Sequence, residues 1–296
     1  SHPGALPDVR PGSLDEDLRR RDVTINAIAL GLDGTLTAVE GALDDLQAGV
    51  LRVLHDGSFV DDPTRVWRVA RYAARLGFTV EANTRALAAA ADPSTVSGDR
   101  LGAELRLALR EPDPPAAFEA VRELNPAYLP EGFEARPREL AAALALLPDD
   151  GRADLLTLAA CTARMDALAL LRWLDDMGFT APDRDLVAAA SRFVIGAPLR
   201  AARTSAEIAR AARGAPVEAV ALAGGENARR WIDELRHVRL EIDGRDLLAA
   251  GIPEGPEIGA RLQRALDRKL DGEVSGREEE VAAALAGGES RGRLGA

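Results

Sequence analysis

Residues 59–77 read FVDDPTRVWRVARYAARLG, and this stretch predicts an amphipathic helix. Asp62 and Pro63 form a strong start signal, because an Asp side chain caps a first helical turn and Pro suits the first helical position. Gly77 is the predicted end of the helix. Between them, apolar residues recur at helical spacing, at Val66, Val69, Ala70 and Ala73.

The opposite face of this predicted helix carries arginines. Arg65, Arg68, Arg71 and Arg75 fall within about 120° of one another around the helix axis. Taken alone, such a face is most simply a solvated surface, and Asp62 alone is most simply an N-cap. These residues indicate a function only together with other parts of the chain.

Most of the remaining sequence also has helical character. It is 47% hydrophobic with only 4% aromatic residues, which favours Ala- and Leu-rich helices over a β-sandwich. Residues 15–30 predict a short helix, and 36–53 predict strand-turn-strand because Gly41 and Gly49 interrupt short apolar runs. The expected fold class is therefore mainly α. The further predicted helices cover 84–91, 101–109, 116–123, 139–147, 153–177, 183–194, 201–213, 217–223, 228–236, 245–250, 257–270 and 278–285.

Length and composition narrow the class of protein. A chain of 296 residues can bury a full core and is expected to form two or three sub-domains. The single cysteine, Cys161, excludes a disulfide framework and predicts a cytoplasmic protein. No apolar run is long enough for a transmembrane helix. The net charge of −11 argues weakly against a nucleic-acid partner, yet all basic residues except Lys269 are arginines, which suit bidentate recognition of bases and phosphates.

Two blocks of sequence resemble motifs of the tRNA nucleotidyltransferase and poly(A) polymerase family. Residues 19–27, RRRDVTINA, are similar to the family's RRDFTINA motif, with Val23 in place of Phe. Residues 61–65, DDPTR, are similar to its (E/D)DxxR motif and precede an arginine-rich helix, as in the family. Residues 97–105, SGDRLGAEL, resemble its SxERI..EL element, and 242–259 resemble its helical tail. The similarity extends from the first residues to about Leu285, so the chain is identified as a member of this family.

The resemblance implies a site that selects C and A. CTP and ATP present an exocyclic amino donor beside a ring-nitrogen acceptor, whereas UTP and GTP present the opposite pair. A carboxylate, which only accepts, next to a guanidinium, which only donates, fits C and A. By the resemblance, Asp62 and Arg65 are this pair. The other implied nucleotide-binding residues are Arg68 and Arg71 for the base, ribose or triphosphate, Arg21 for the incoming nucleotide and Asp22 for the ribose 2′-hydroxyl.

The resemblance also implies catalysis by two Mg²⁺ ions on a DxD pair upstream of the RRDFTINA motif. No such pair is expected before Arg19, so we expect an N-terminally truncated chain that holds no metal, has no catalytic residue of its own and is inactive alone. Asp15 and Asp17 have DxD spacing but are expected to cap a helix. His2, His55 and His237 form no obvious ligand cluster, and Thr37 stands where many relatives have Asp.

The resemblance further implies a head remnant over 1–56, a nucleotide-reading neck over 57–120, and a helical body and tail over 121–296. We expect tRNA as the partner and CTP and ATP as substrates. Residues 200–239 carry eight arginines against five acids, a local excess that suits phosphate binding. The predicted RNA-binding residues are Arg100, Arg200, Arg203, Arg210, Arg213, Arg229 and Arg230.

Several functions stay open at this point. CCA addition to tRNA 3′ ends is the predicted reaction, but relatives that add only CC, only A or a poly(A) tail share these motifs. A catalytically dead helical tRNA-binding module is the alternative from another class, and it predicts tRNA affinity without nucleotide selectivity. An interaction scaffold with no RNA role is disfavoured by the match to four motifs.

Overall fold

The computed structural model describes residues 12–195 and 198–286, which divide into two compact units. The first unit contains residues 12–140 and 153–192, and the second contains 141–152 and the described residues from 193 onward. The ends of the predicted head remnant and tail, 1–11 and 287–296, lie outside the described residues. The described chain is mostly helical with a few short strands, which confirms the predicted fold class.

The first unit begins with a small mixed region. Here α1 (Leu14–Arg19) and η1 (Thr24–Asn26) precede the antiparallel strands β1 (Ile28–Leu30) and β2 (Leu36–Ala38). Then come α2 (Ala42–Ala48), β3 (Val50–Leu51), α3 (Ser58–Asp61), α4 (Arg65–Leu76) and β4 (Thr79–Val80), and β4 pairs in parallel with β3.

Two expectations for this region are wrong. Residues 15–30 are not one helix, because α1 ends at Arg19 and the chain then turns into β1. Residues 36–53 are not only strand and turn, because α2 lies between Gly41 and Gly49. Both glycines have positive φ, 76° and 66°, so they bound a helix at its two ends rather than forming hairpin turns.

The rest of the first unit is helical: α5 (Ala82–Ala89), η2 (Pro93–Thr95), α6 (Gly98–Ala108), α7 (Pro114–Leu124), η3 (Pro126–Tyr128), α9 (Ala153–Cys161) and α10 (Ala167–Asp176). The helices α8 (Pro137–Leu144) and α11 (Ala181–Ile195) begin in this unit and end in the second. The single helix predicted over 153–177 is wrong. The chain leaves the helix at 162–166, and the Asp166 carboxylate caps α10 by accepting from the Leu168 and Ala169 amides at 3.0 Å.

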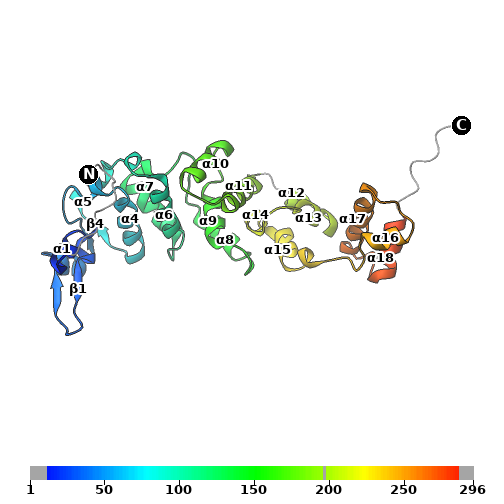
Figure 1. Cartoon of the computed structure of the whole chain (residues 1–296), viewed down its shortest axis with the longest axis horizontal. Coiled ribbons are helices and arrows are strands. Elements are labelled where there is room, and N and C mark those ends of the chain that lie inside the picture. The colour runs from blue at the N-terminus through cyan, green and yellow to red at the C-terminus, as the bar shows by residue number, and fades with distance from the viewer. Residues whose placement is uncertain (1–11, 196–197, 287–296) are drawn as a thin grey trace. The chain divides into compact units, whose positions relative to one another are not determined.

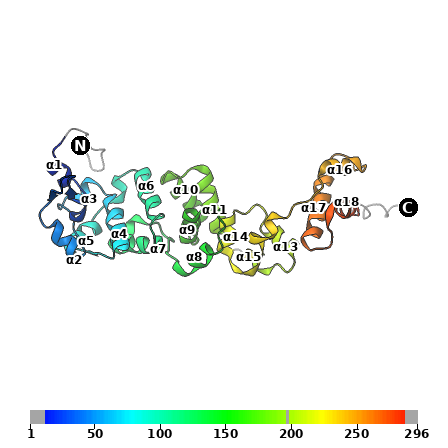
Figure 2. The ribbon, with the colours of Figure 1, turned by 90° about the horizontal axis from the view of Figure 1, so that it is seen from below.

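A row of aromatic rings forms the core of the first unit. The helix α4 packs along α7, and α6 lies beside both (Figures 1 and 2). The rings of Trp67 and Phe118 meet edge to face with centroids 6.3 Å apart, followed by Phe118–Phe133 at 5.0 Å and Phe133–Trp173 at 6.0 Å. Because such contacts add to the stability gained from burial, this row ties α4 firmly to α7 and α10.

The second unit contains α12 (Pro198–Ala201), α13 (Ser205–Ala211), α14 (Val217–Ala223), α15 (Gly225–Asp233), η4 (Leu235–His237), α16 (Gly244–Ala249), α17 (Pro256–Leu270) and α18 (Gly276–Leu285). The helix predicted over 201–213 is wrong at its start, because α12 ends at Ala201 and Thr204 caps α13. The last three helices enclose an apolar cluster around Leu247 and Ala284. Glu280 is fully buried beside it and accepts a hydrogen bond from Lys269 Nζ at 2.5 Å. No described helix is long and apolar enough to cross a membrane.

Candidate functional site

The turn before α4 differs from the prediction. Asp62 is not the N-cap of the helix, because it lies in extended conformation and α4 begins three residues later at Arg65. Its Oδ1 instead accepts from the Thr64 amide at 3.0 Å and the Thr64 hydroxyl at 2.7 Å, which closes a tight local turn. The helix ends at Gly77 with φ 68°, as predicted.

The Asp62 carboxylate is anchored through one oxygen only. Arg100 Nη2, from α6, lies 2.9 Å from Asp62 Oδ1, the same oxygen that Thr64 binds. Oδ2 accepts no hydrogen bond from any residue in 12–195 or 198–286. The side chain is 29% exposed. Asp62 therefore presents a fixed carboxylate with one oxygen available as an acceptor.

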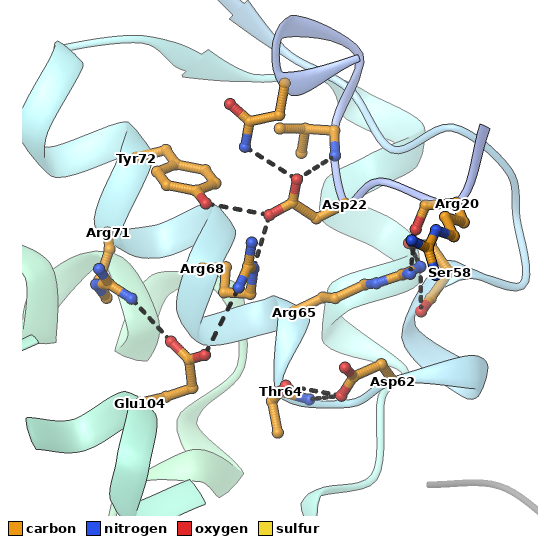
Figure 3. Close-up of polar contacts among 12 residues, drawn as sticks. Arg20, Asp22, Ser58, Asp62, Thr64, Arg65, Arg68, Arg71, Tyr72 and Glu104 are labelled. Atoms are coloured by element: carbon orange, nitrogen blue, oxygen red, sulfur yellow. Dashed lines mark hydrogen bonds and ion pairs between the residues drawn. The ribbon is translucent and has the colours of Figure 1, made fainter. Parts of the chain in front are cut away.

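Arg65 points to other partners than Asp62. Its Nη1 donates to Ser58 Oγ at 2.8 Å, and its Nη2 donates to the Arg20 carbonyl at 2.9 Å. Figure 3 shows the two side chains directed to different sides of the turn. The predicted pair is therefore brought to the same turn but not into direct contact, and Arg65 joins α3 and α4 to the RRDFTINA-like block.

Asp22 is the centre of a buried hydrogen-bond network. Its Oδ1 accepts from the Val23 amide at 3.0 Å and from Asn26 Nδ2 at 2.9 Å. Its Oδ2 accepts from Arg68 Nε at 2.7 Å and from the Tyr72 hydroxyl at 3.1 Å (Figure 3). Burial opposes the charged form, but the Asn26 hydrogen bond and the Arg68 cation outweigh it, so the pKa of Asp22 lies below its usual value. Asp22 thus fixes Arg68 against the first block.

Arg71 is not part of a solvated arginine face. It is buried, and its guanidinium donates to Glu104 Oε2 and Glu111 Oε1, each at 2.8 Å. Burial raises the pKa of Glu104 despite the neighbouring Arg71. Arg75 is partly exposed and lies 3.6 Å from Glu111. The α4 arginines therefore differ in role, although they share one helical face in the sequence.

Sequence reasoning missed several residues that bind the predicted site side chains. Tyr72, Ser58 and Glu111 were not expected to take part. Glu104 was noted only as a motif position. The acids that neutralise Arg71 lie 33 and 40 residues further along the chain, so helical periodicity could not reveal them. A buried arginine needs such partners, and that need is visible only once burial is known.

The first block also holds exposed ion pairs. Arg21 Nη2 and Arg20 Nη2 both contact the Asp17 carboxylate, and Arg19 pairs with Asp15 at 2.8 Å. Asp15 and Asp17 lie in the first turn of α1, where Ser13 is the N-cap. In the described part of the chain, no group of three or more His, Cys, Asp or Glu side chains is placed to hold a metal ion.

The arginines predicted to bind RNA have varied surroundings. Arg100 contacts Asp62 in the first unit. In the second unit, Arg200 Nε donates to the Ala223 carbonyl at 2.8 Å, Arg210 pairs with Asp267 at 3.0 Å, and Arg230 donates to Ser205 at 2.7 Å. Arg203, Arg213 and Arg229 are exposed. Nothing in the described structure pairs with the Arg213 or Arg229 side chain, which leaves both available to an anion.

Comparisons with known proteins agree on one family. No family model matches the chain. An A-adding tRNA nucleotidyltransferase of Geobacter sulfurreducens is 32% identical over 96% of this chain, which spans 36% of that relative's length. A CC-adding tRNA nucleotidyltransferase of Deinococcus radiodurans is 32% identical over 94% of this chain and 67% of its own length. A solved structure of a CCA-adding enzyme with ATP has a TM-score of 0.77 and 26% identity, over 95% of this chain and 74% of that one.

Proposed function

The chain belongs to the family of CCA-adding and A-adding tRNA nucleotidyltransferases, and from this premise we propose that it selects C and A nucleotides for addition to tRNA 3′ ends. One observation carries the proposal. Asp62 is held through Oδ1 by Thr64 and Arg100, and its Oδ2 is left as an acceptor. A fixed acceptor of this kind fits the exocyclic amino group that C and A share.

The proposed division of roles follows from the contacts. Asp62 Oδ2 receives the amino group, and Arg65 supplies a donor to the ring nitrogen after small movement of its guanidinium. Arg68, 39% exposed and fixed by Asp22, holds the base or ribose. Arg21 is exposed and reaches the triphosphate by exchanging Asp17 for phosphate. Each Asp22 oxygen already accepts two hydrogen bonds, and Arg71 is buried against two carboxylates. We therefore propose that Asp22 and Arg71 hold the neighbouring site residues in place and do not themselves contact the nucleotide.

The proposed reaction is CCA-type addition, with CTP and ATP as substrates, tRNA as partner and Mg²⁺ as the ion that the family's chemistry requires. Relatives named for A addition and for CC addition keep the partial reactions open as alternatives. The predicted boundaries lie at residue 56, between head and neck, and at residue 120, between neck and body. Both fall inside the first compact unit, and the division stays a proposal. The cytoplasmic location also stays a prediction.

We expect the 296-residue chain alone to incorporate no CMP or AMP into tRNA with Mg²⁺. Two-metal transfer needs carboxylates to hold the ions, and the described residues contain no group of three or more His, Cys, Asp or Glu side chains placed for this. Radiolabel incorporation is the measurement. Transfer above a no-protein control would contradict this expectation and would direct attention to the acids of α1.

The tRNA partner is tested by binding. We expect affinity to fall steeply with salt, because arginine contacts to phosphate release counterions. Replacing Arg213 and Arg229 by Ala should make the slope of log K against log salt shallower by about 2, since each lost phosphate contact removes about 0.9. The matched control replaces Arg85 and Arg110, which are exposed in the first unit. No tRNA binding in low salt, or a slope equal in both variants, would exclude this assignment.

Nucleotide selectivity separates the proposal from a dead tRNA-binding module. Under the proposal, equilibrium dialysis with the chain gives tighter binding of CTP or ATP than of UTP and GTP. A module that only binds tRNA would bind the four nucleotides with equal affinity, and such a result would favour that alternative.

A further inference from the structure

Two glycines of α6 bring its backbone against the end of α10. A Cβ atom added at Gly98 would lie 1.9 Å from the Asp176 carbonyl oxygen, and one added at Gly102 would lie 1.9 Å from the Met177 carbonyl oxygen. Ordinary van der Waals contact needs about 3.5 Å. Only residues without a side chain allow this approach.

A third residue of α6 completes the joint. Arg106 Nη1 donates to the Met177 carbonyl at 3.1 Å and lies 3.4 Å from the Gly178 carbonyl. Its guanidinium also lies 5.1 Å from the centre of the Phe179 ring. These carbonyls form the negative end of the α10 dipole, so a guanidinium is favoured there.

The opposite face of the same helix reaches the proposed nucleotide site. Gly98, Gly102 and Arg106 recur every four residues and share one face, whereas Arg100 and Glu104 lie on the other. Arg100 holds Asp62 at 2.9 Å, and Glu104 holds Arg71 at 2.8 Å. The helix α6 therefore lies between the end of α10 and the residues that fix the base-reading turn.

We propose that Gly98, Gly102 and Arg106 are positioning residues that set nucleotide selection through α6. A packed helix moves as one body, because interiors are too dense to absorb a shift locally. To make room for a side chain at Gly102, α6 must move away from the end of α10 by more than about 1 Å. A movement of this size is enough to break the Arg100–Asp62 contact. The inference rests on the proposed function of Asp62 and extends it to a docking contact with α10.

The test measures binding of CTP, ATP, UTP and GTP to the 296-residue chain by equilibrium dialysis. We expect the wild type to prefer CTP or ATP by at least about tenfold. Arg106→Met keeps an unbranched side chain but loses both carbonyl contacts and the guanidinium over Phe179. Gly102→Ala adds the obstructing methyl. Both should reduce the preference to within about twofold, with tRNA affinity unchanged.

The control is Arg110→Met, an equal change at an exposed arginine just beyond α6, which should keep the full preference. Circular dichroism and thermal unfolding check that each variant folds. If Gly102→Ala does not fold, the test rests on Arg106→Met. Wild-type preference in a folded Arg106→Met or Gly102→Ala protein overturns the inference alone. Absence of preference in the wild type overturns the proposed function, and this inference with it.

Discussion

Asp62→Asn is expected to lower kcat/KM for C addition by roughly 30- to 1000-fold and to relax discrimination against U. The Asn oxygen can keep the bonds of Oδ1 to Thr64 and Arg100, which places an amide NH₂ where Oδ2 was. A donor would then face the amino group of the base. Losing one charge-assisted hydrogen bond and leaving its partner unpaired costs about 2–4 kcal/mol in transition-state binding.

A chimera provides the assay. This chain replaces the matching part of the Deinococcus radiodurans CC-adding relative, two-thirds of which it covers. Arg65→Ala should cause a loss of similar size, and the double variant should lose less than the sum, because both groups act on one base. Arg85→Ala, an exposed arginine on α5, is the control. Unchanged C-over-U preference in both single variants would return Asp62 and Arg65 to a purely structural role.

Arg71→Met is expected to destabilise the first unit by about 3–5 kcal/mol, because it removes one partner of a buried charge network. Glu104 and Glu111 would remain buried and lose the cation nearest to each of them, since both contact Arg71 at 2.8 Å. Urea denaturation of the chain measures the change in the free energy of unfolding.

Two further variants make this prediction specific. Arg75→Met removes a partly exposed arginine 3.6 Å from Glu111 and should cost less than about 1 kcal/mol. Adding Glu104→Gln and Glu111→Gln to Arg71→Met should recover part of the loss, because the unpaired charges are then gone. Equal destabilisation by Arg71→Met and Arg75→Met would mean that burial of the network is energetically unimportant.

Helix ends were predicted well where a residue with a strong conformational preference marks them. The end of α4 at Gly77 follows from a left-handed residue that only glycine adopts easily. The start of the same helix was misplaced, because an Asp before Pro can close a turn with Thr64 as well as cap a helix. The break before α10 was missed because Asp166 caps it without any Pro or Gly nearby.

The site residues were predicted by motif, and their partners were not. Asp62, Arg65, Arg68 and Asp22 all lie around one turn, yet the sequence could not distinguish a residue with a spare acceptor from one already saturated. Asp62 keeps one oxygen available, whereas Asp22 accepts two hydrogen bonds on each oxygen. Arg100 was predicted to bind RNA, and its contact with Asp62 appears only when α6 folds against the turn.

Lys269 gives the chain a built-in protease probe. A lysine-specific protease has a single target bond in all 296 residues, and that bond lies in the last turn of α17. The amine is tied to fully buried Glu280, and the next residue, Leu270, is also buried. Cutting therefore requires the end of α17 to open, so the digestion rate reports the equilibrium of that opening. The rate at which the band of the intact chain is replaced by two fragment bands on a gel would measure this equilibrium.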